Sequence, residues 1–148
     1  MRMERNIEQP VVLESPATPS LNEKNRKGLP REIIRVLGDV RFAPGSAALL
    51  PPSRSRLDQF IDWLRSGSPD GQYYIEVQGH TDAAGTDEQN RLVSRARAEV
   101  VRRYLCAKMN RPVESIGIVA AGSLSPVGDD RTAEGRSRNR RVVVLVLR

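Results

Sequence analysis

Apolar residues recur along the chain with two different periods, and these periods predict four strands and two helices. The four apolar stretches typical of strands cover residues 31–42, 73–78, 116–120 and 141–147. A first helix is expected to open at residues 51–53, because apolar side chains then recur at i, i+3, i+4 and i+7. Those side chains are Leu57, Phe60, Ile61 and Leu64. We therefore expect the order β-α-β-α-β-β.

The second helix is expected to begin after Thr86 and to end near residue 110, ahead of Pro112. Thr86 and Gln89 have the spacing of a capping box, in which each residue satisfies an N–H group of the other at the helix start. The pattern assigns an apolar face to Leu92, Ala96, Val100 and Tyr104. A different face, which we expect at the surface, carries Asn90, Ser94 and Arg97 at i, i+4 and i+7.

Two helices that each bury one apolar face predict an α/β (α+β) two-layer sandwich with the helices on one face of the sheet. The last stretch, 141–147, is apolar almost throughout, so we expect it inside the sheet rather than at an edge. Residues 128–139 are polar and rich in Arg, and we expect a loop there.

The length of 148 residues suits one domain with a tail. Residues 1–30 are polar and contain scattered prolines, so we expect a flexible tether there, with the domain at 31–148. No apolar run approaches the length of a bilayer span. The first residues have neither the apolar centre of a signal peptide nor a lipobox cysteine, so we expect any membrane anchor to lie outside this chain.

The net charge of +6 permits a nucleic acid, an anionic membrane surface or an anionic polymer as partner, and does not choose among them. Much of the positive charge in the second half lies in one Arg-rich stretch: Arg131, Arg136, Arg138, Arg140 and Arg141. A basic nucleic-acid binder is therefore one hypothesis. The chain has only two Phe, one Trp and three Tyr, so stacking on single strands is poorly supported. We expect no specific nucleic-acid partner.

Catalysis is not expected from the residue types present. The chain has one histidine, His80, and one cysteine, Cys106, and neither belongs to a nucleophile motif or a metal-ligand pair. We expect His80 to be a hydrogen-bonded residue that shapes the loop after its strand, and Cys106 to be a small core residue. The sequence therefore predicts neither an enzyme nor a cofactor nor a metal site.

The most informative stretch, residues 79–98, joins the second predicted strand to the second predicted helix. It places a carboxylate, Asp82, at the strand end and a guanidinium, Arg97, on the helix, close enough to meet across the turn. Such a pair suits a zwitterionic ligand, because Arg binds a carboxylate bidentately and Asp binds an ammonium. From the pattern alone, the favoured interpretation is that Asp82 is a turn residue and Arg97 a solvated helix residue.

Three segments resemble the signature of the OmpA-like (OmpA C-terminal) peptidoglycan-binding domain. They are G-H-T-D-A-A-G at 79–85, N-R-L-V-S-R-A-R-A at 90–98 and G-R-S-R-N-R-R-V at 135–142, and they fall in the family's order and spacing. Val93 stands where the family usually has Leu. The resemblance covers about residues 35–148. It implies a mixed four-stranded sheet in which the last strand lies between the first and the second.

The resemblance also implies a binding site. Asp82 would hold the amine of a diaminopimelate residue and Arg97 its carboxylate, and Thr81, Asn90 and Arg140 would line or orient the site. The last strand, inside the sheet, would bring Arg140 close to Asp82. Ala43 departs from the family, which often has Asp directly after the Phe of this loop, so one polar contact to the ligand is expected to be missing.

The expected function is non-catalytic binding of the diaminopimelate-containing stem peptide of peptidoglycan, which would anchor an envelope protein or the outer membrane to the cell wall. The expected location is the periplasm and cell envelope. The alternative within this reading is a stator-like wall anchor of a motor or secretion complex. A homodimer is also compatible with the sequence.

Overall fold

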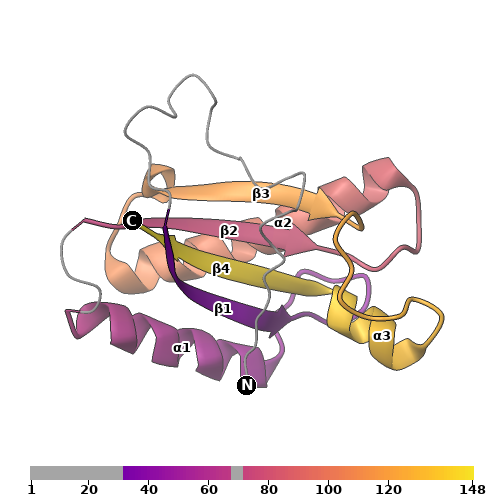
Figure 1. The fold of residues 1–148 in the computed structure, drawn as a ribbon, viewed down its shortest axis with the longest axis horizontal. Coiled ribbons are helices and arrows are strands. Elements are labelled where there is room, and N and C mark those ends of the chain that lie inside the picture. The colour runs from indigo at the N-terminus through magenta and orange to yellow at the C-terminus, as the bar shows by residue number, and fades with distance from the viewer. Residues whose placement is uncertain (1–31, 68–71) are drawn as a thin grey trace.

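The structure, a computed structural model, describes residues 32–67 and 72–148 (Figure 1). The predicted tether at 1–30 lies outside the described residues. The strands are β1 (Ile33–Arg41), β2 (Tyr74–His80), β3 (Ile116–Gly122) and β4 (Arg141–Leu147). The helices are α1 (Pro51–Arg65), α2 (Asp87–Met109) and α3 (Ala133–Asn139), and a 3-10 turn covers Val113–Ser115. All four strands and both long helices lie where the apolar periods predict them.

The four strands form one mixed sheet in the order β1-β4-β2-β3. β4 pairs antiparallel with both β1 and β2, while β2 and β3 are parallel. The predicted position of the last strand, between the first and the second, is confirmed. Val142 to Val146 are buried without alternation, because β4 has a neighbour on each side and side chains covered on both faces.

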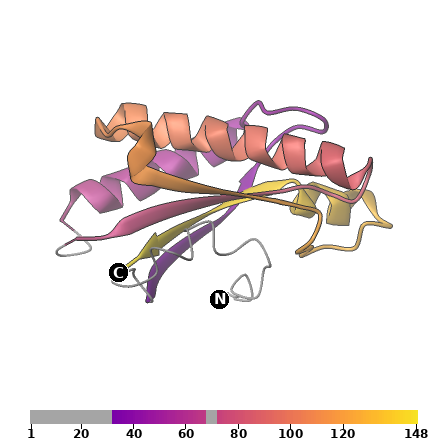
Figure 2. The same cartoon turned by 90° about the horizontal axis from the view of Figure 1, so that it is seen from above.

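Both long helices lie on the same face of the sheet, as Figure 2 shows. The core between the two layers contains the predicted face of α1, with Leu57, Phe60, Ile61 and Leu64 all 5% exposed or less. Val77 of β2 and Val144 of β4 lie in the same cluster from the sheet side. The two-layer sandwich with helices on one face is therefore confirmed for α1 and α2.

The predicted faces of α2 are wrong in its first half. Leu92 is 61% exposed, whereas Asn90, Ser94 and Arg97 are buried together with Ala98, Val101 and Leu105. The reason is a close approach of backbones: a Cβ on Gly79 of β2 would lie only 1.9 Å from the carbonyl oxygen of Ser94. The helix start therefore packs its small and polar side on the sheet, and the apolar Leu92 is left outside.

The predicted loop at 128–139 is also wrong in its second half, because Ala133–Asn139 forms α3. The hydroxyl of Thr132 caps this helix by accepting a hydrogen bond from the Gly135 N–H at 2.9 Å. Gly135 lies so close to the preceding loop that a Cβ there would be 1.9 Å from the Asp129 carbonyl oxygen. A seven-residue helix with no apolar face and an internal glycine has no periodic signal to detect.

Candidate functional site

The site begins where β2 ends. The Thr81 N–H donates to the Gly122 carbonyl at 2.8 Å, so this end of β2 remains attached to β3. The chain then turns at Gly85, whose φ of +89° favours glycine. The predicted capping box at the start of α2 is confirmed, because Thr86 and Gln89 each accept from the other's backbone N–H. These contacts fix the direction of α2 relative to the strand end.

Asp82 lies in this turn and holds two donors. Its Oδ1 accepts from the Ala84 N–H at 3.1 Å, which is ordinary Asp turn geometry. Its Oδ2 accepts from Nη1 of Arg140 at 2.9 Å, and both side chains of this ion pair are 14% exposed. Arg140 follows α3 directly and precedes β4, so the sheet order that sets β4 beside β2 also brings Arg140 to Asp82.

Arg97 is the largest fully buried side chain, with 1% exposure. Its Nε donates to the Ser46 carbonyl at 2.9 Å. Its Nη1 and Nη2 make longer contacts to the carbonyls of His80, at 3.5 Å, and Ala43, at 3.4 Å. The guanidinium also lies over the Phe42 ring, 5.5 Å from its centroid. Arg97 thus joins the loop after β1 to the end of β2.

Asp82 and Arg97 each bind other partners in the structure rather than one another. The carboxylate of Asp82 pairs with Arg140, and Arg97 binds backbone carbonyls instead. The two groups still share one electrostatic environment. Burial lowers the pKa of Arg97 below its ordinary value, the charge of Arg140 lowers that pKa further, and the charge of Asp82 opposes the change.

Thr81 and Asn90, the other predicted site residues, lie beside the same turn. Thr81 is 4% exposed, and its hydroxyl has no hydrogen-bond partner among residues 32–67 and 72–148. Asn90 is 5% exposed, and its Oδ1 lies 3.4 Å from the position that a Cβ on Gly85 would take. The structure thus gathers all five predicted residues around the end of β2.

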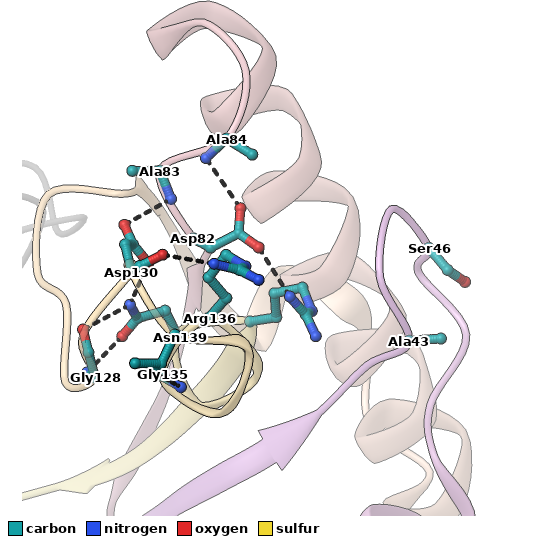
Figure 3. Close-up of polar contacts among 12 residues, drawn as sticks. Ala43, Ser46, Asp82, Ala83, Ala84, Gly128, Asp130, Gly135, Arg136 and Asn139 are labelled. Carbon is teal, nitrogen blue, oxygen red and sulfur yellow. Dashed lines mark hydrogen bonds and ion pairs between the residues drawn. The ribbon is translucent and has the colours of Figure 1, made fainter.

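A supporting network around Asp130 was not predicted from the sequence (Figure 3). Asp130 accepts from the Ala83 N–H through Oδ2 at 2.9 Å and from Asn139 Nδ2 through Oδ1 at 2.7 Å. Arg136 donates to the Asp130 carbonyl at 2.9 Å. Asn139 is fully buried and also accepts from the N–H groups of Val127 and Gly128. The third signature segment contains Arg136 and Asn139, but a sequence does not reveal which distant turn they support.

His80 differs from its predicted role. Its side chain is 1% exposed, and neither ring nitrogen has a hydrogen-bond partner in the described part of the chain. Because Gly79 faces α2, strand alternation turns His80 toward the opposite face of the sheet. Burial, aided by the charge of Arg141, lowers the pKa of His80 well below its ordinary value. The imidazole is therefore neutral at pH 7.

This buried imidazole predicts a loss of stability under mildly acidic conditions. The unfolded histidine takes up a proton near pH 6.5, and the folded one takes it up only at lower pH, because its pKa is lowered. The free energy of unfolding is therefore expected to fall below pH 6.5 by up to about 1.4 kcal/mol per pH unit. Urea titrations between pH 7.5 and 5 measure this slope.

The variant His80→Gln is the control for this prediction, because His80 is the only histidine of the chain. The slope between pH 6.5 and 5 is expected to flatten in the variant. A wild-type profile that is already flat over this interval contradicts the prediction.

Cys106 lies in the core, as predicted. It is 5% exposed, its thiol donates to the Pro112 carbonyl at 3.5 Å, and burial raises its pKa. Within residues 32–67 and 72–148, no cluster of three or more His, Cys, Asp or Glu side chains is arranged to hold a metal ion. Over the same residues, no helix has the length and apolar character needed to span a membrane.

The family of the chain follows from comparison with known sequences. The profile of the OmpA family matches residues 41–140, which is more than half of the chain, and the chain belongs to this family. Outer membrane porin F of Pseudomonas aeruginosa is 33% identical over 129 residues, covering 86% of this chain and 36% of the porin. The peptidoglycan-binding protein ArfA of Mycobacterium tuberculosis is 33% identical over 109 residues, covering 74% of this chain and 32% of ArfA. The chain thus spans about a third of the length of these relatives.

Solved structures have the same fold. The peptidoglycan-associated lipoprotein from Burkholderia pseudomallei superposes with a TM-score of 0.63 and 26% identity, covering 86% of this chain and 98% of the lipoprotein chain. The cell wall anchor of the T6SS from Pseudomonas aeruginosa superposes with a TM-score of 0.61 and 29% identity, covering 76% of this chain and 80% of the anchor.

Proposed function

We propose that this domain binds peptidoglycan without catalysis and that it recognises the diaminopimelate residue of the stem peptide. The observation that carries the proposal is the position of Arg97, which three backbone carbonyls hold beside the Asp82–Arg140 ion pair. The names of two similar proteins, a peptidoglycan-binding protein and a peptidoglycan-associated lipoprotein, support the same ligand.

The donors of Arg97 fit a carboxylate ligand. A guanidinium has five N–H groups, and the three contacts to Ser46, His80 and Ala43 leave two of them. The contacts to His80 and Ala43 are long, so a carboxylate can replace them at small cost. Because Arg97 is 1% exposed, such a ligand must displace part of the 43–46 loop or the Arg140 side chain to reach it.

Asp82 supplies the opposite charge. In the proposed complex the Asp82 carboxylate accepts hydrogen bonds from the ligand ammonium, and Arg97 donates to the carboxylate on the same ligand carbon atom. Thr81 contributes a buried hydroxyl that has no partner among the described residues, and Asn90 borders the same turn. A side chain that ends in both an ammonium and a carboxylate is what distinguishes diaminopimelate from lysine, so this site would separate the two wall types.

In the cell, the proposed role is to anchor an envelope component to the wall from the periplasmic side. The similarity to the T6SS wall anchor favours a second form of this role, a wall anchor within a secretion or motor complex. The two forms share the ligand and differ in what the rest of the protein attaches to. A basic nucleic-acid binder gains no support from the site, because Arg97 is buried and Arg140 is paired with Asp82.

The test is a pull-down of the purified chain with insoluble wall material of two kinds. We expect the chain to sediment with diaminopimelate-type walls and to remain in solution with lysine-type walls. With a lysine-type wall Arg97 gains no ligand carboxylate, which costs roughly 1–3 kcal/mol of binding. Equal retention on both wall types would contradict the diaminopimelate specificity. Retention on neither wall type would contradict peptidoglycan binding itself.

A further inference from the structure

The charges around the end of β2 do not balance. The guanidiniums of Arg97, Arg136 and Arg140 meet there with the two carboxylates of Asp82 and Asp130, and the charge of the buried Arg141 also acts on His80. Both carboxylates already accept hydrogen bonds, from Ala84 and Arg140 for Asp82 and from Ala83 and Asn139 for Asp130. The strand end therefore has an excess of positive charge in a region that is largely shielded from solvent.

Arg140 is the residue of this group that has donors available for a further anion. Its side chain is 14% exposed, and Asp82 is its one charged partner in the described part of the chain. Its buried Nε has no hydrogen-bond acceptor among those residues. The N–H groups of Arg97, in contrast, donate to three backbone carbonyls, and Arg136 donates to the Asp130 carbonyl. Arg140 thus has unused donors beside the place proposed for the ligand.

Ligand binding at Asp82 would leave this positive excess uncorrected unless the ligand brings more than one carboxylate. An ammonium bound at Asp82 Oδ2 competes with Arg140 for the same oxygen, which the two now share at 2.9 Å. A ligand group that is zwitterionic brings no net charge and leaves Arg140 with a weakened partner. A buried cation without a partner is costly. A second ligand carboxylate removes that cost by pairing with Arg140.

We infer that Arg140 is a specificity residue that binds a second carboxylate, so that the site prefers stems ending in diaminopimelate with a free stem-chain carboxylate. This inference rests on the proposed function. Such an end carries one ammonium and two carboxylates and therefore a net charge of −1, which offsets part of the positive excess at the site. The ammonium goes to Asp82, the side-chain carboxylate to Arg97 and the stem-chain carboxylate to Arg140. Amidation of the stem-chain carboxylate, or its extension by a further residue, removes the third contact.

The experiment is titration calorimetry of the purified chain with three synthetic tripeptides of the stem. The first ends in diaminopimelate with both carboxylates free, the second has its stem-chain carboxylate amidated, and the third ends in lysine. The wild-type chain is expected to bind the free acid on the order of tenfold more tightly than the amide, because a partly buried charge loses its partner in the amide complex.

Two variants assign this difference to its cause. Arg140→Gln is expected to bind the acid and the amide with equal affinity. Arg138→Gln removes an exposed charge two residues before Arg140, on α3, and is expected to keep the full difference in affinity between acid and amide.

The outcomes separate the two proposals. Equal binding of acid and amide by the wild-type chain overturns the inference, while a preference for diaminopimelate over lysine would keep the proposed function intact. If a folded Arg140→Gln variant keeps the full difference in affinity between the acid and the amide, the assignment to Arg140 is overturned. Equal binding of the diaminopimelate and lysine peptides rejects the proposed diaminopimelate specificity together with the inference, and no binding of either peptide rejects the proposed stem-peptide ligand as well.

Discussion

Replacing Arg97 with alanine is expected to lower the free energy of unfolding by about 3–5 kcal/mol, because the substitution leaves a cavity and removes the donor from buried carbonyls. Arg97 is 1% exposed and donates to the carbonyls of Ser46, His80 and Ala43. The loop after β1 would lose its attachment to the end of β2. Urea denaturation followed by circular dichroism measures the change.

The matched control is Arg103→Ala. Arg103 lies on the same helix, and its side chain is 64% exposed in a weak contact with Glu99. Its replacement is expected to change the free energy of unfolding by no more than about 0.5 kcal/mol. Arg102 is a poorer control, because it is partly buried and contacts the Ile116 carbonyl at 3.4 Å. Equal stability of the Arg97→Ala and Arg103→Ala proteins would contradict the structural role of Arg97.

Arg97 is thus expected to stabilise the fold and, in the proposed function, to bind the ligand carboxylate, so a loss of binding in an Arg97 variant has two possible causes. The sequence led us to expect a surface residue whose loss affects binding alone, and the burial of Arg97 shows that expectation to be wrong. Arg97→Lys is the more informative variant for binding, because it keeps the charge and loses the planar fork that binds a carboxylate bidentately. Its affinity should be measured only where the urea curve shows a folded protein.

Replacing Asp82 with asparagine is expected to weaken binding of a diaminopimelate stem peptide by about 2–4 kcal/mol, with the fold retained. The variant removes the negative charge that would hold the ligand ammonium. It keeps an oxygen that can accept from the Ala84 N–H, so the turn before α2 is expected to persist. Titration calorimetry measures the affinity, and a thermal melt of the same sample verifies folding.

Asp129→Asn is the control for Asp82. Asp129 is a neighbouring, half-exposed carboxylate that pairs with Arg131 at 3.0 Å, so it matches Asp82 in chemistry and in having an Arg partner. Its replacement is expected to leave the affinity unchanged. Normal binding by a folded Asp82→Asn protein would show that the ligand ammonium is held elsewhere. An equal loss in both variants would indicate a diffuse charge effect rather than a site.

Local sequence determined the elements of this protein to a large extent. The face of α1 from Leu57 to Leu64 was predictable because every one of its repeating positions is apolar. The capping box of Thr86 and Gln89 was predictable because both partners lie within one turn. The inner position of β4 was predictable because a strand without polar alternation is covered on both faces.

The sequence predicted which residues form the candidate site but not all of the contacts that these residues make. Three signature segments named Asp82, Arg97 and Arg140, and all three lie around the end of β2. The proximity of Arg140 to Asp82, 58 residues apart, was predictable only through the sheet order that the resemblance implies. The carbonyl partners of Arg97 were not predictable, because Ala43, for example, is 54 residues away. Pairing over such distances depends on how the strands are ordered.

What only the tertiary structure decided is which polar residues are buried. Gly79 lets the backbone of α2 approach β2, and this contact rotates the polar side of the helix start inward and Leu92 outward. Helical periodicity identifies a face by its apolar residues, so it fails where a buried face is polar. Arg97 is stable there because backbone carbonyls from two other segments satisfy it, and those carbonyls appear beside it only when the sheet has formed. The sequence thus determined the four strands, the two long helices and the residues of the candidate site, and the packing of the sheet determined the contacts that these residues make.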